Sequence, residues 1–337
     1  MKRAIVLFNL GGPDGPEAVE PFLYNLFSDP AVISLPTFLR RPLARFVAHR
    51  RAQTTRRIYA RIGGRSPILP ETEAQAAALA AELGEGTNVF VVMRYWHPFA
   101  DETAARVKQY DPDRIVLLPL YPQYSTTTTA SSFAAWNRAA AAVGLTAPTA
   151  EVCCYPVSEG WIAALADLTQ KTLARARLDL SYRLLLSAHG LPERVINRGD
   201  PYRRQVEETA AALAVRLNAT DWRVCYQSRV GPLKWIGPAT ADEIRRAGAE
   251  GLGVAVVPIS FVSEHSETLV ELDRDYAELA RAAGAKDYLR VPAAGTHPAF
   301  IRGLADLVRK CGERDVSSAA DGRYCPAAVK RCGCLSV

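Results

Sequence analysis

The 337-residue sequence contains no apolar run that approaches the roughly 20 residues needed to span a bilayer. Its N-terminus, MKRAIVLFNLGGP, has only a short apolar core before a Gly-Gly-Pro turn, which predicts a first strand and not a signal peptide. Hydrophobic residues make up 49% of the chain and charged residues 23%, which excludes a disordered or fibrous protein. We therefore expect a globular protein of the cytoplasm, with room for about two domains.

Acidic residues are absent between residues 30 and 70, although this segment is rich in arginine. The arginines are Arg40, Arg41, Arg45, Arg50, Arg51, Arg56, Arg57, Arg61 and Arg65, and apolar residues such as Phe38 and Phe46 lie among them. Such a segment suits a large, flat, apolar ligand that carries carboxylates, because arginine binds a carboxylate through two hydrogen bonds. The same composition suits an anionic membrane surface, or the solvated face of an ordinary pair of basic helices.

The seven cysteines are an odd number and accompany no secretion signal, which argues against a disulfide framework. Three of them, Cys325, Cys332 and Cys334, are crowded near the C-terminus. In a reducing compartment this clustering suggests a ligand set for a metal or an iron–sulfur cluster.

Two halves of the chain repeat one order of features. In each half a strand leads into a Gly-x-Pro turn, a second strand leads into an Arg-containing loop that ends in Pro, and a third apolar strand is interrupted by Pro. Helical patterns, such as residues 71–83 and 205–217, lie between the strands, which implies parallel sheets. The repeat predicts two similar Rossmann-like α/β domains. We expect them at residues 1–157, with residues 30–70 as an insertion, and at residues 158–310, followed by a cysteine-containing tail at 311–337.

Residues 253–276, GVAVVPISFVSEHSETLVELDRDY, combine a buried strand with an acidic helix. Ser263 is the expected N-cap of this helix, and Glu264, His265 and Glu267 follow at the turn. Ligands of open α/β sheets bind beyond the carboxyl ends of the strands, so these side chains are placed to meet a substrate. The alternative is that Glu264 and Glu267 only complement the helix dipole, as acids in a first helical turn commonly do.

Three acids in this helix, Glu267, Glu271 and Asp275, are spaced four residues apart. In a regular α-helix such a row drifts around the axis by about 40° per step. A wider π-type turn would align all three, and turns of this kind favour functional sites. We hypothesise an acidic row that leads into a cleft between the domains; a solvated helix face is the alternative.

His189 ends a strand of the second half and is followed by Gly190 and Pro192, which turn the loop sharply. If the two sheets face each other, His189 and Glu267 would share one cleft. A neutral imidazole accepts protons and binds metals near pH 7, and a carboxylate binds cations. The alternative is that His189 is a hydrogen-bonded part of the scaffold.

Seven segments resemble ferrochelatases and occur in that family's order across nearly the whole chain. They are LFNLGGP (7–13), IGGRSPI (62–68), MRYWHP (93–98), LYPQYS (120–125), LSAHGLPERV (186–195), YQSRVGPLKWIGP (226–238) and PISFVSEHSETLVELD (258–273). The resemblance implies insertion of Fe²⁺ into protoporphyrin IX, which gives protoheme and releases two protons in the terminal step of heme biosynthesis. It also implies a chelatase-type fold, with the porphyrin in the cleft between the two domains.

The resemblance further implies roles for particular residues. His189 and Glu267 match the family's catalytic pair, and both are expected, with Glu271 and Asp275, to bind the iron substrate. A second set matches the porphyrin-binding positions: Leu10, Arg94, Tyr95 and Tyr121 on the opposite cleft wall, and Arg51, Tyr59 and Ser66 at the lip that holds the propionates.

Some members of the family bind a [2Fe–2S] cluster on C-terminal cysteines and one distant cysteine. Here the tail spacing is C-x6-C-x-C, and Thr126 stands where animal members have the distant ligand. Cys153 or Cys154 is the expected replacement, as in bacterial members that place this ligand further along the chain. The expected ligand set is therefore Cys153 or Cys154 with Cys325, Cys332 and Cys334, and free thiols or a zinc site are the alternatives.

Three other functions compete with this hypothesis. The substrate would be coproporphyrin III if the chain followed the family's Gram-positive branch, but the apolar lip favours protoporphyrin. A non-catalytic tetrapyrrole or heme carrier is disfavoured by the pairing of His189 with Glu267. Binding to nucleic acid rests on the arginines alone, and we expect none; instead we expect the arginine-rich segment to make peripheral contact with the inner face of an anionic membrane.

Overall fold

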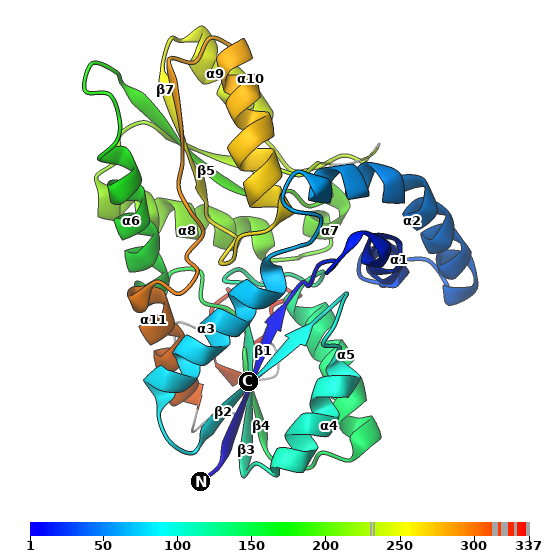
Figure 1. The fold of residues 1–337 in the computed structure, drawn as a ribbon. Helices are drawn as coiled ribbons and strands as arrows, with labels where there is room; N and C mark the ends of the chain where they lie inside the picture. Colours follow the sequence, from blue (N-terminus) through cyan, green and yellow to red (C-terminus); the bar gives the residue numbers. More distant parts are fainter. Residues whose placement is uncertain (230, 232, 312–315, 318–322, 327–328, 335–337) are drawn as a thin grey trace.

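The computed structural model of the chain describes residues 1–229, 231, 233–311, 316–317, 323–326 and 329–334. Two parallel sheets form its framework, one above the other in Figure 1. The strand order is β2-β1-β3-β4-β9 in the first sheet and β6-β5-β7-β8 in the second. The predicted α/β fold with two parallel sheets flanked by helices is therefore confirmed.

The first sheet consists of β1 (Arg3–Asn9), β2 (Thr87–Met93), β3 (Arg114–Pro119), β4 (Thr149–Val152) and β9 (Val316–Ser317). The central strands are buried and apolar, as expected for parallel strands covered on both faces. Asn9 pairs with Met93, and Phe8 pairs with Pro119, so the carboxyl ends of β1, β2 and β3 lie level. The loops that follow these strands therefore meet at one edge of the sheet.

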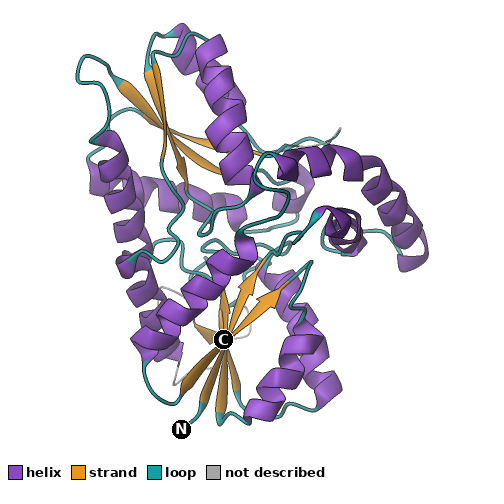
Figure 2. Cartoon of the chain, viewed as in Figure 1, coloured by secondary structure: helices purple, strands orange, loops and turns teal. Residues whose placement is uncertain are grey.

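Helices cover both faces of the first sheet (Figure 2). On one face α4 (Ala100–Tyr110) and α5 (Thr129–Val143) pack through Val107, Phe133 and Trp136. On the other face α3 (Ile68–Leu83) packs through Leu79.

The second sheet consists of β5 (Tyr182–His189), β6 (Trp222–Gln227), β7 (Gly253–Pro258) and β8 (Asp287–Arg290). One face is covered by α6 (Glu159–Leu173) and α8 (Tyr202–Leu217), and the other by α9 (Thr240–Ala249) and α10 (Tyr276–Ala282). A short helix, α7 (Glu193–Asn197), follows β5. His189 pairs with Gln227, and Ser187 pairs with Pro258, so these carboxyl ends are level as well.

The arginine-rich segment forms a helical arm with the residues before it. The 3₁₀-helix η1 (Pro16–Ala18) leads into α1 (Val19–Ser28), which packs against the long helix α2 (Thr37–Ala60). Figure 1 shows α1 and α2 extending sideways from the two sheets. Within the described part of the chain, no helix is long and apolar enough to cross a membrane.

The C-terminal part of the chain returns to the first sheet. Helix α11 (Pro298–Lys310) packs against α3 and α6, and β9 then pairs with β4. At the contact between α6 and α11, a Cβ atom added to Gly160 would lie 2.6 Å from the Cα atom of Gly303, so this position requires glycine. Because α11, from the second half of the sequence, packs against α3 of the first half, the domain boundary at residues 157 and 158 stays a prediction. The expected tail, residues 311–337, falls partly outside the described residues.

The acidic helix after β7 has the geometry that its spacing predicts. Residues Glu267–Asp275 form a π-helix, η2, which continues into α10. The prediction of Ser263 as its N-cap is wrong. The Ser263 hydroxyl donates instead to Oε1 of Gln75 on α3, at 2.9 Å, and thereby ties the turn after β7 to the first domain.

Candidate active site

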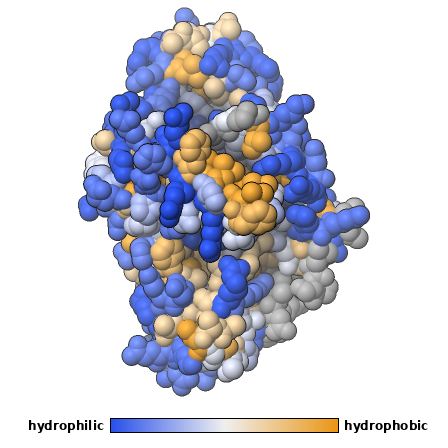
Figure 3. All heavy atoms as spheres, turned by 90° about the vertical axis from the view of Figure 1, so that its right-hand side faces the viewer, coloured by the Kyte–Doolittle hydropathy of each residue, from blue (hydrophilic) through white to orange (hydrophobic). Residues whose placement is uncertain are grey.

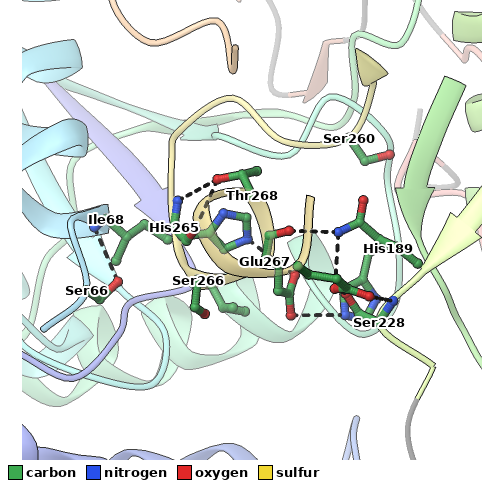
Figure 4. Close-up of polar contacts among 12 residues, drawn as sticks. Ser66, Ile68, His189, Ser228, Ser260, His265, Ser266, Glu267 and Thr268 are labelled. Carbon is green, nitrogen blue, oxygen red and sulfur yellow. Dashed lines mark hydrogen bonds and ion pairs between the residues drawn. The ribbon is translucent and has the colours of Figure 1, made fainter. Parts of the chain in front are cut away.

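The imidazole of His189 faces the carboxylate of Glu267 (Figure 4). Nε2 of His189 lies 3.4 Å from Oε1 of Glu267. Nδ1 lies 2.6 Å from the carbonyl oxygen of Gly190, and because a carbonyl can only accept, Nδ1 carries a proton. About a third of each side chain is exposed, 35% for His189 and 28% for Glu267, so both groups remain accessible from the solvent side. The predicted His–Glu pairing is present in the structure.

The Glu267 carboxylate lies between two histidines. Its second oxygen, Oε2, is 3.2 Å from Nε2 of His265, which is almost fully buried. The ring of Phe261 packs against both histidines, with centroids 4.8 Å from His265 and 6.4 Å from His189. The sequence places His265 at this turn, but residues two apart do not face each other on a regular helix, so its contact with Glu267 was not predicted.

The two partners shift each other's pKa values in opposite directions. Burial alone would lower the pKa of His189, but the charge of Glu267 and its hydrogen bond raise that pKa to about 9. Burial alone would raise the pKa of Glu267, but the charge of His189 and the hydrogen bonds from both histidines hold that pKa well below its usual range. At neutral pH the pair is therefore an imidazolium and a carboxylate.

The pair also links stability to pH. The raised pKa of His189 gives a stabilising contribution that is complete below its ordinary pKa of 6.5 and is lost as the pH rises through about 9. The lowered pKa of Glu267 gives a contribution that is present above its ordinary pKa of 4.5 and is lost as the pH falls.

The other two acids of η2 contact different parts of the chain. Glu271 accepts hydrogen bonds from the backbone N–H of Ser228, at 2.9 Å, and from the hydroxyl of Tyr276, at 2.8 Å. Asp275 pairs with Arg61 just after α2, with an Oδ1–Nη1 distance of 2.6 Å. The row thus runs from His189, past the loop after β6, to the base of the helical arm.

The residues expected on the opposite wall follow the level ends of β1, β2 and β3. Tyr95 donates its backbone N–H to the carbonyl oxygen of Leu10 at 3.0 Å, which joins two of these loops. The Tyr95 hydroxyl and Nη2 of Arg94 both bind Oδ2 of buried Asp29, at 2.9 and 2.6 Å. Tyr121 packs against the core of the first domain. Asp29 was not predicted, because its partners lie more than 60 positions away in the sequence.

The residues expected at the lip lie at and beyond α2. The Tyr59 hydroxyl is 3.5 Å from Oγ of Ser266, the neighbour of Glu267, and burial raises the pKa of Tyr59 to about 12. Ser66 is buried against Gly12, and its backbone N–H donates to the Pro13 carbonyl at 2.7 Å. Arg51 stacks over the ring of Phe27 at 5.7 Å, and burial lowers its pKa. Tyr59 and Ser66 therefore border the His–Glu site, while Arg51 lies nearer the start of α2.

Five cysteines gather in a second buried cluster beside Tyr124. They are Cys153, Cys154, Cys325, Cys332 and Cys334. The Sγ atoms of Cys153, Cys332 and Cys334 lie within 4.8 Å of one another. Of the two remaining cysteines, Cys225 belongs to the core of the second domain and Cys311 to the core around α11. Burial raises the pKa of Cys225 to about 12, as expected for an inert core thiol.

The architecture is that of the chelatase class. Two solved structures of a chelatase share the fold: SirB from Bacillus subtilis with Fe³⁺, with a TM-score of 0.53 and 13% identity, and the sirohydrochlorin chelatase SirB from its subspecies spizizenii in complex with cobalt, with a TM-score of 0.56 and 12% identity. The alignments cover 92% and 93% of this chain and 96% of each SirB chain. At this identity they show the fold alone.

Closer relatives identify the family. The ferrochelatase family model matches residues 2–311. The ferrochelatases of Phenylobacterium zucineum and Caulobacter vibrioides are each 55% identical over 99% of this chain, and the alignments cover 98% and 97% of those proteins. That of Pelagibacter ubique is 45% identical over 100% of this chain and 99% of its own length.

The chain belongs to the ferrochelatase family. It is a lyase that inserts Fe²⁺ into protoporphyrin in the terminal step of heme biosynthesis, and the porphyrin and Fe²⁺ are its substrates. The resemblance seen in the seven motifs is confirmed. The alternatives, coproporphyrin as substrate and a carrier without activity, are not favoured.

Proposed function

We propose that His189 and Glu267 act together as the proton-accepting and iron-handling pair of this ferrochelatase. The observation that carries the proposal is the 3.4 Å contact between Nε2 of His189 and Oε1 of Glu267 in a partly exposed site. Metallation requires removal of two pyrrole N–H protons and delivery of Fe²⁺ with little of its hydration shell. The imidazole supplies the base, and the carboxylate supplies a hard oxygen ligand that binds iron and releases it again.

The resting charge state determines the order of these events. In the free enzyme His189 is an imidazolium at neutral pH and cannot accept a proton. Binding of Fe²⁺ to Glu267 places a stronger positive charge on the same carboxylate, which lowers the pKa of His189. The imidazole then gives its Nε2 proton to solvent, accepts the first pyrrole proton, passes it to solvent, and accepts the second, so that it ends as the imidazolium it was at the start. Iron binding thus prepares the base, and two protons leave for each iron inserted.

We propose that Glu271 and Asp275 guide Fe²⁺ toward Glu267 along the π-helix. Both are carboxylates on the same π-helix as Glu267, which supports a shared path for iron along that helix. Among the His, Cys, Asp and Glu side chains of the described residues, three metal-ligating atoms lie within 4.8 Å of one another only in the group of Cys153, Cys332 and Cys334. The acids of η2 therefore do not form one tight metal site. Separate, weak ligands suit a path along which iron moves, whereas a storage site needs several ligands around one ion.

We propose that the macrocycle lies between η2 and the loops that follow β1, β2 and β3. Leu10 and Tyr121 would contact it, while Arg94 and Tyr95, held by Asp29, would make that wall rigid. A rigid wall resists the porphyrin and helps to bend it, so that its nitrogens turn toward the metal. Arg51, Tyr59 and Ser66 would hold the propionates at the rim.

Removing the charge of Glu267 is expected to lower the pKa of His189. In the native protein that pKa is about 9, and in Glu267→Gln it should fall clearly toward the ordinary 6.5, because the two largest raising effects, the charge of Glu267 and its hydrogen bond, are lost, while the weaker ones from the Gly190 carbonyl and Glu271 remain. Titration of ¹³C- and ¹⁵N-labelled histidines by NMR measures both values, with exposed His49 as the internal control. A His189 pKa that stayed near 9 in the variant would refute the pairing.

We propose that the cysteine cluster binds a [2Fe–2S] cluster through Cys153, Cys325, Cys332 and Cys334. Four buried thiolate donors from two parts of the chain fit the ligand set of such a cluster. Cys153 is favoured over Cys154 because its Sγ lies with those of Cys332 and Cys334. When bound, the cluster supplies one-electron redox chemistry. Free thiols and a zinc site are the competing assignments.

We propose that α2 contacts an anionic membrane at its periphery. Its exposed apolar residues include Phe38 and Phe46, which are 74% and 63% exposed. Figure 3 shows an apolar patch surrounded by hydrophilic side chains on the side of the molecule from which α2 extends. Apolar side chains inserted among lipid headgroups, with arginines around them, are typical of interfacial helices.

Replacing Phe38 and Phe46 together by serine is expected to weaken binding to phosphatidylglycerol vesicles by at least about tenfold, since each buried Phe contributes about 1.5–3 kcal/mol. Co-sedimentation at low and high salt measures the affinity, which should also fall with salt. Leu178→Ser, at a fully exposed position of the second half, is the matched control and should leave binding unchanged. Equal binding by the double variant and the native protein would exclude α2 as the contact.

A further inference from the structure

A buried glutamine connects the second domain to the cysteine cluster. Gln205 lies on the first turns of α8 and is fully buried. Its Nε2 atom is 3.4 Å from Sγ of Cys154 and 3.3 Å from Sγ of Cys325. Its Oε1 atom accepts a hydrogen bond from the backbone N–H of Tyr124 at 2.7 Å. The side chain thus bridges two cysteines and the loop after β3.

The contact with Tyr124 determines the orientation of the Gln205 amide. A backbone N–H can only donate, so the atom 2.7 Å from it must be the carbonyl oxygen of the side chain. The NH₂ group then has to point at the sulfur atoms. Both of its protons are directed to sulfur, and sulfur carries more negative charge as a thiolate ligand than as a thiol.

The same helix also reaches the active site. The Tyr202 hydroxyl donates to the backbone carbonyl of His189 at 3.0 Å, one turn before Gln205. Asp200, just before α8, accepts hydrogen bonds from the backbone N–H of Thr126 at 2.7 Å and from the hydroxyl of Ser125 at 3.0 Å. The start of α8 is therefore fastened to the cysteine side of the first domain at two points and to the strand end that carries His189 at a third.

We propose that Gln205 is a positioning residue for the iron–sulfur cluster: it donates one hydrogen bond to Sγ of Cys325, a proposed ligand, and one to Sγ of the neighbouring Cys154, and it links the cluster to the helix that supports His189. The inference rests on the cluster proposed above. Hydrogen bonds to cysteine sulfur stabilise the more negatively charged, reduced state, so they raise the reduction potential of a cluster. Without these bonds the reduced cluster is less stable, and the sulfur ligands are more weakly held.

Two variants of Gln205 test the inference by spectroscopy and potentiometry on the full-length protein with its cluster. Gln205→Met keeps the length of the side chain and removes both donors. Gln205→Glu also removes the donors but keeps an acceptor for the N–H of Tyr124. We expect a more negative reduction potential than in the native protein for both variants, a larger shift for Glu because of its charge, and several-fold faster loss of the cluster to a chelator.

Gln123→Met is the matched control. Gln123 is also a buried glutamine at the contact between the two halves, where Nε2 donates to Oγ1 of Thr209 and to the carbonyl oxygen of Ile259, each at 2.9 Å. Its loss should lower the melting temperature to a similar extent and leave the potential and the visible circular dichroism unchanged. Cluster loss in both Gln205 variants with secondary structure intact, and not in Gln123→Met, would also support the inference.

Three results would overturn the proposal, and they differ from one another. A native potential and spectrum in both Gln205 variants would show that the amide does not act on the cluster. An equal shift of the reduction potential in Gln123→Met would show that the change in the Gln205 variants comes from general destabilisation of the protein. Native protein prepared without oxygen that contained no iron and showed no visible absorption beyond bound porphyrin would refute the cluster itself, and the role of Gln205 with it.

Discussion

Replacing His189 by alanine is expected to lower kcat for iron insertion by about two to four orders of magnitude, the usual contribution of a positioned general base. The imidazole is the group that faces Glu267 at 3.4 Å, and its backbone is fixed by β5 and by the Tyr202 hydroxyl. Alanine therefore removes the base without moving the strand that carries it. Protoporphyrin affinity should stay within a few-fold, because the wall and lip residues are untouched.

Anaerobic stopped-flow absorption measures the rate of protoheme formation, and quenching of tryptophan fluorescence measures porphyrin binding. His49→Ala is the control for loss of a histidine, since the His49 side chain is 77% exposed and, within the described part of the chain, forms an ion pair with Glu20 on α1. We expect native kinetics from this control. Near-native kcat in His189→Ala would show that another group takes the pyrrole protons.

Replacing Cys332 by serine is expected to reduce bound iron from about two atoms per chain to nearly none, with loss of the visible absorption of the cluster. The Sγ atom of Cys332 lies within 4.8 Å of those of Cys153 and Cys334. Its loss leaves only three of the four proposed ligands, which cannot hold the cluster. A serine hydroxyl is a much weaker ligand than a thiolate, because it keeps its proton near pH 7. The melting temperature should fall, since the proposed cluster would join the C-terminal cysteines to Cys153 at the end of β4.

Iron analysis and visible spectroscopy on anaerobically purified protein measure this loss, and Cys225→Ala is the matched control. Cys225 is equally buried but lies in the core of the second domain, so its removal should leave the iron content unchanged. Unchanged iron in Cys332→Ser would contradict the proposed ligands. Zinc in place of iron in the native protein would favour the competing assignment.

Much of the fold could be predicted because its signals are local. Apolar β-branched runs and Ala-rich helical patterns determined the order of strands and helices, and the spacing of Glu267, Glu271 and Asp275 indicated a π-helix, which the structure contains. Helix starts were less accurate. The helices expected at 71–83 and 205–217 begin three residues earlier, at Ile68 and Tyr202, each directly after a proline that suits a helix start.

The contacts that complete the site could not be predicted, because they join residues distant in sequence or unusual in local geometry. Asp29 meets Arg94 and Tyr95 only where the helical arm packs on the first domain, and Gln205 meets the cysteines only where α8 packs against the loop after β3. Ser263 has the composition of an N-cap, yet its hydroxyl binds Gln75 of the first domain instead. The preference of serine for an N-cap is not realised here, because a tertiary hydrogen bond already satisfies its hydroxyl.

The most direct test of the account is the rate of iron insertion in the variant that combines His189→Ala with Glu267→Gln, compared with the two single variants. If the imidazole and the carboxylate act as one unit, the first substitution already removes what the second would remove. The double variant should then be no slower than the slower single variant, to within about threefold. A loss equal to the product of the two single losses would show that the groups act independently, and would contradict the account.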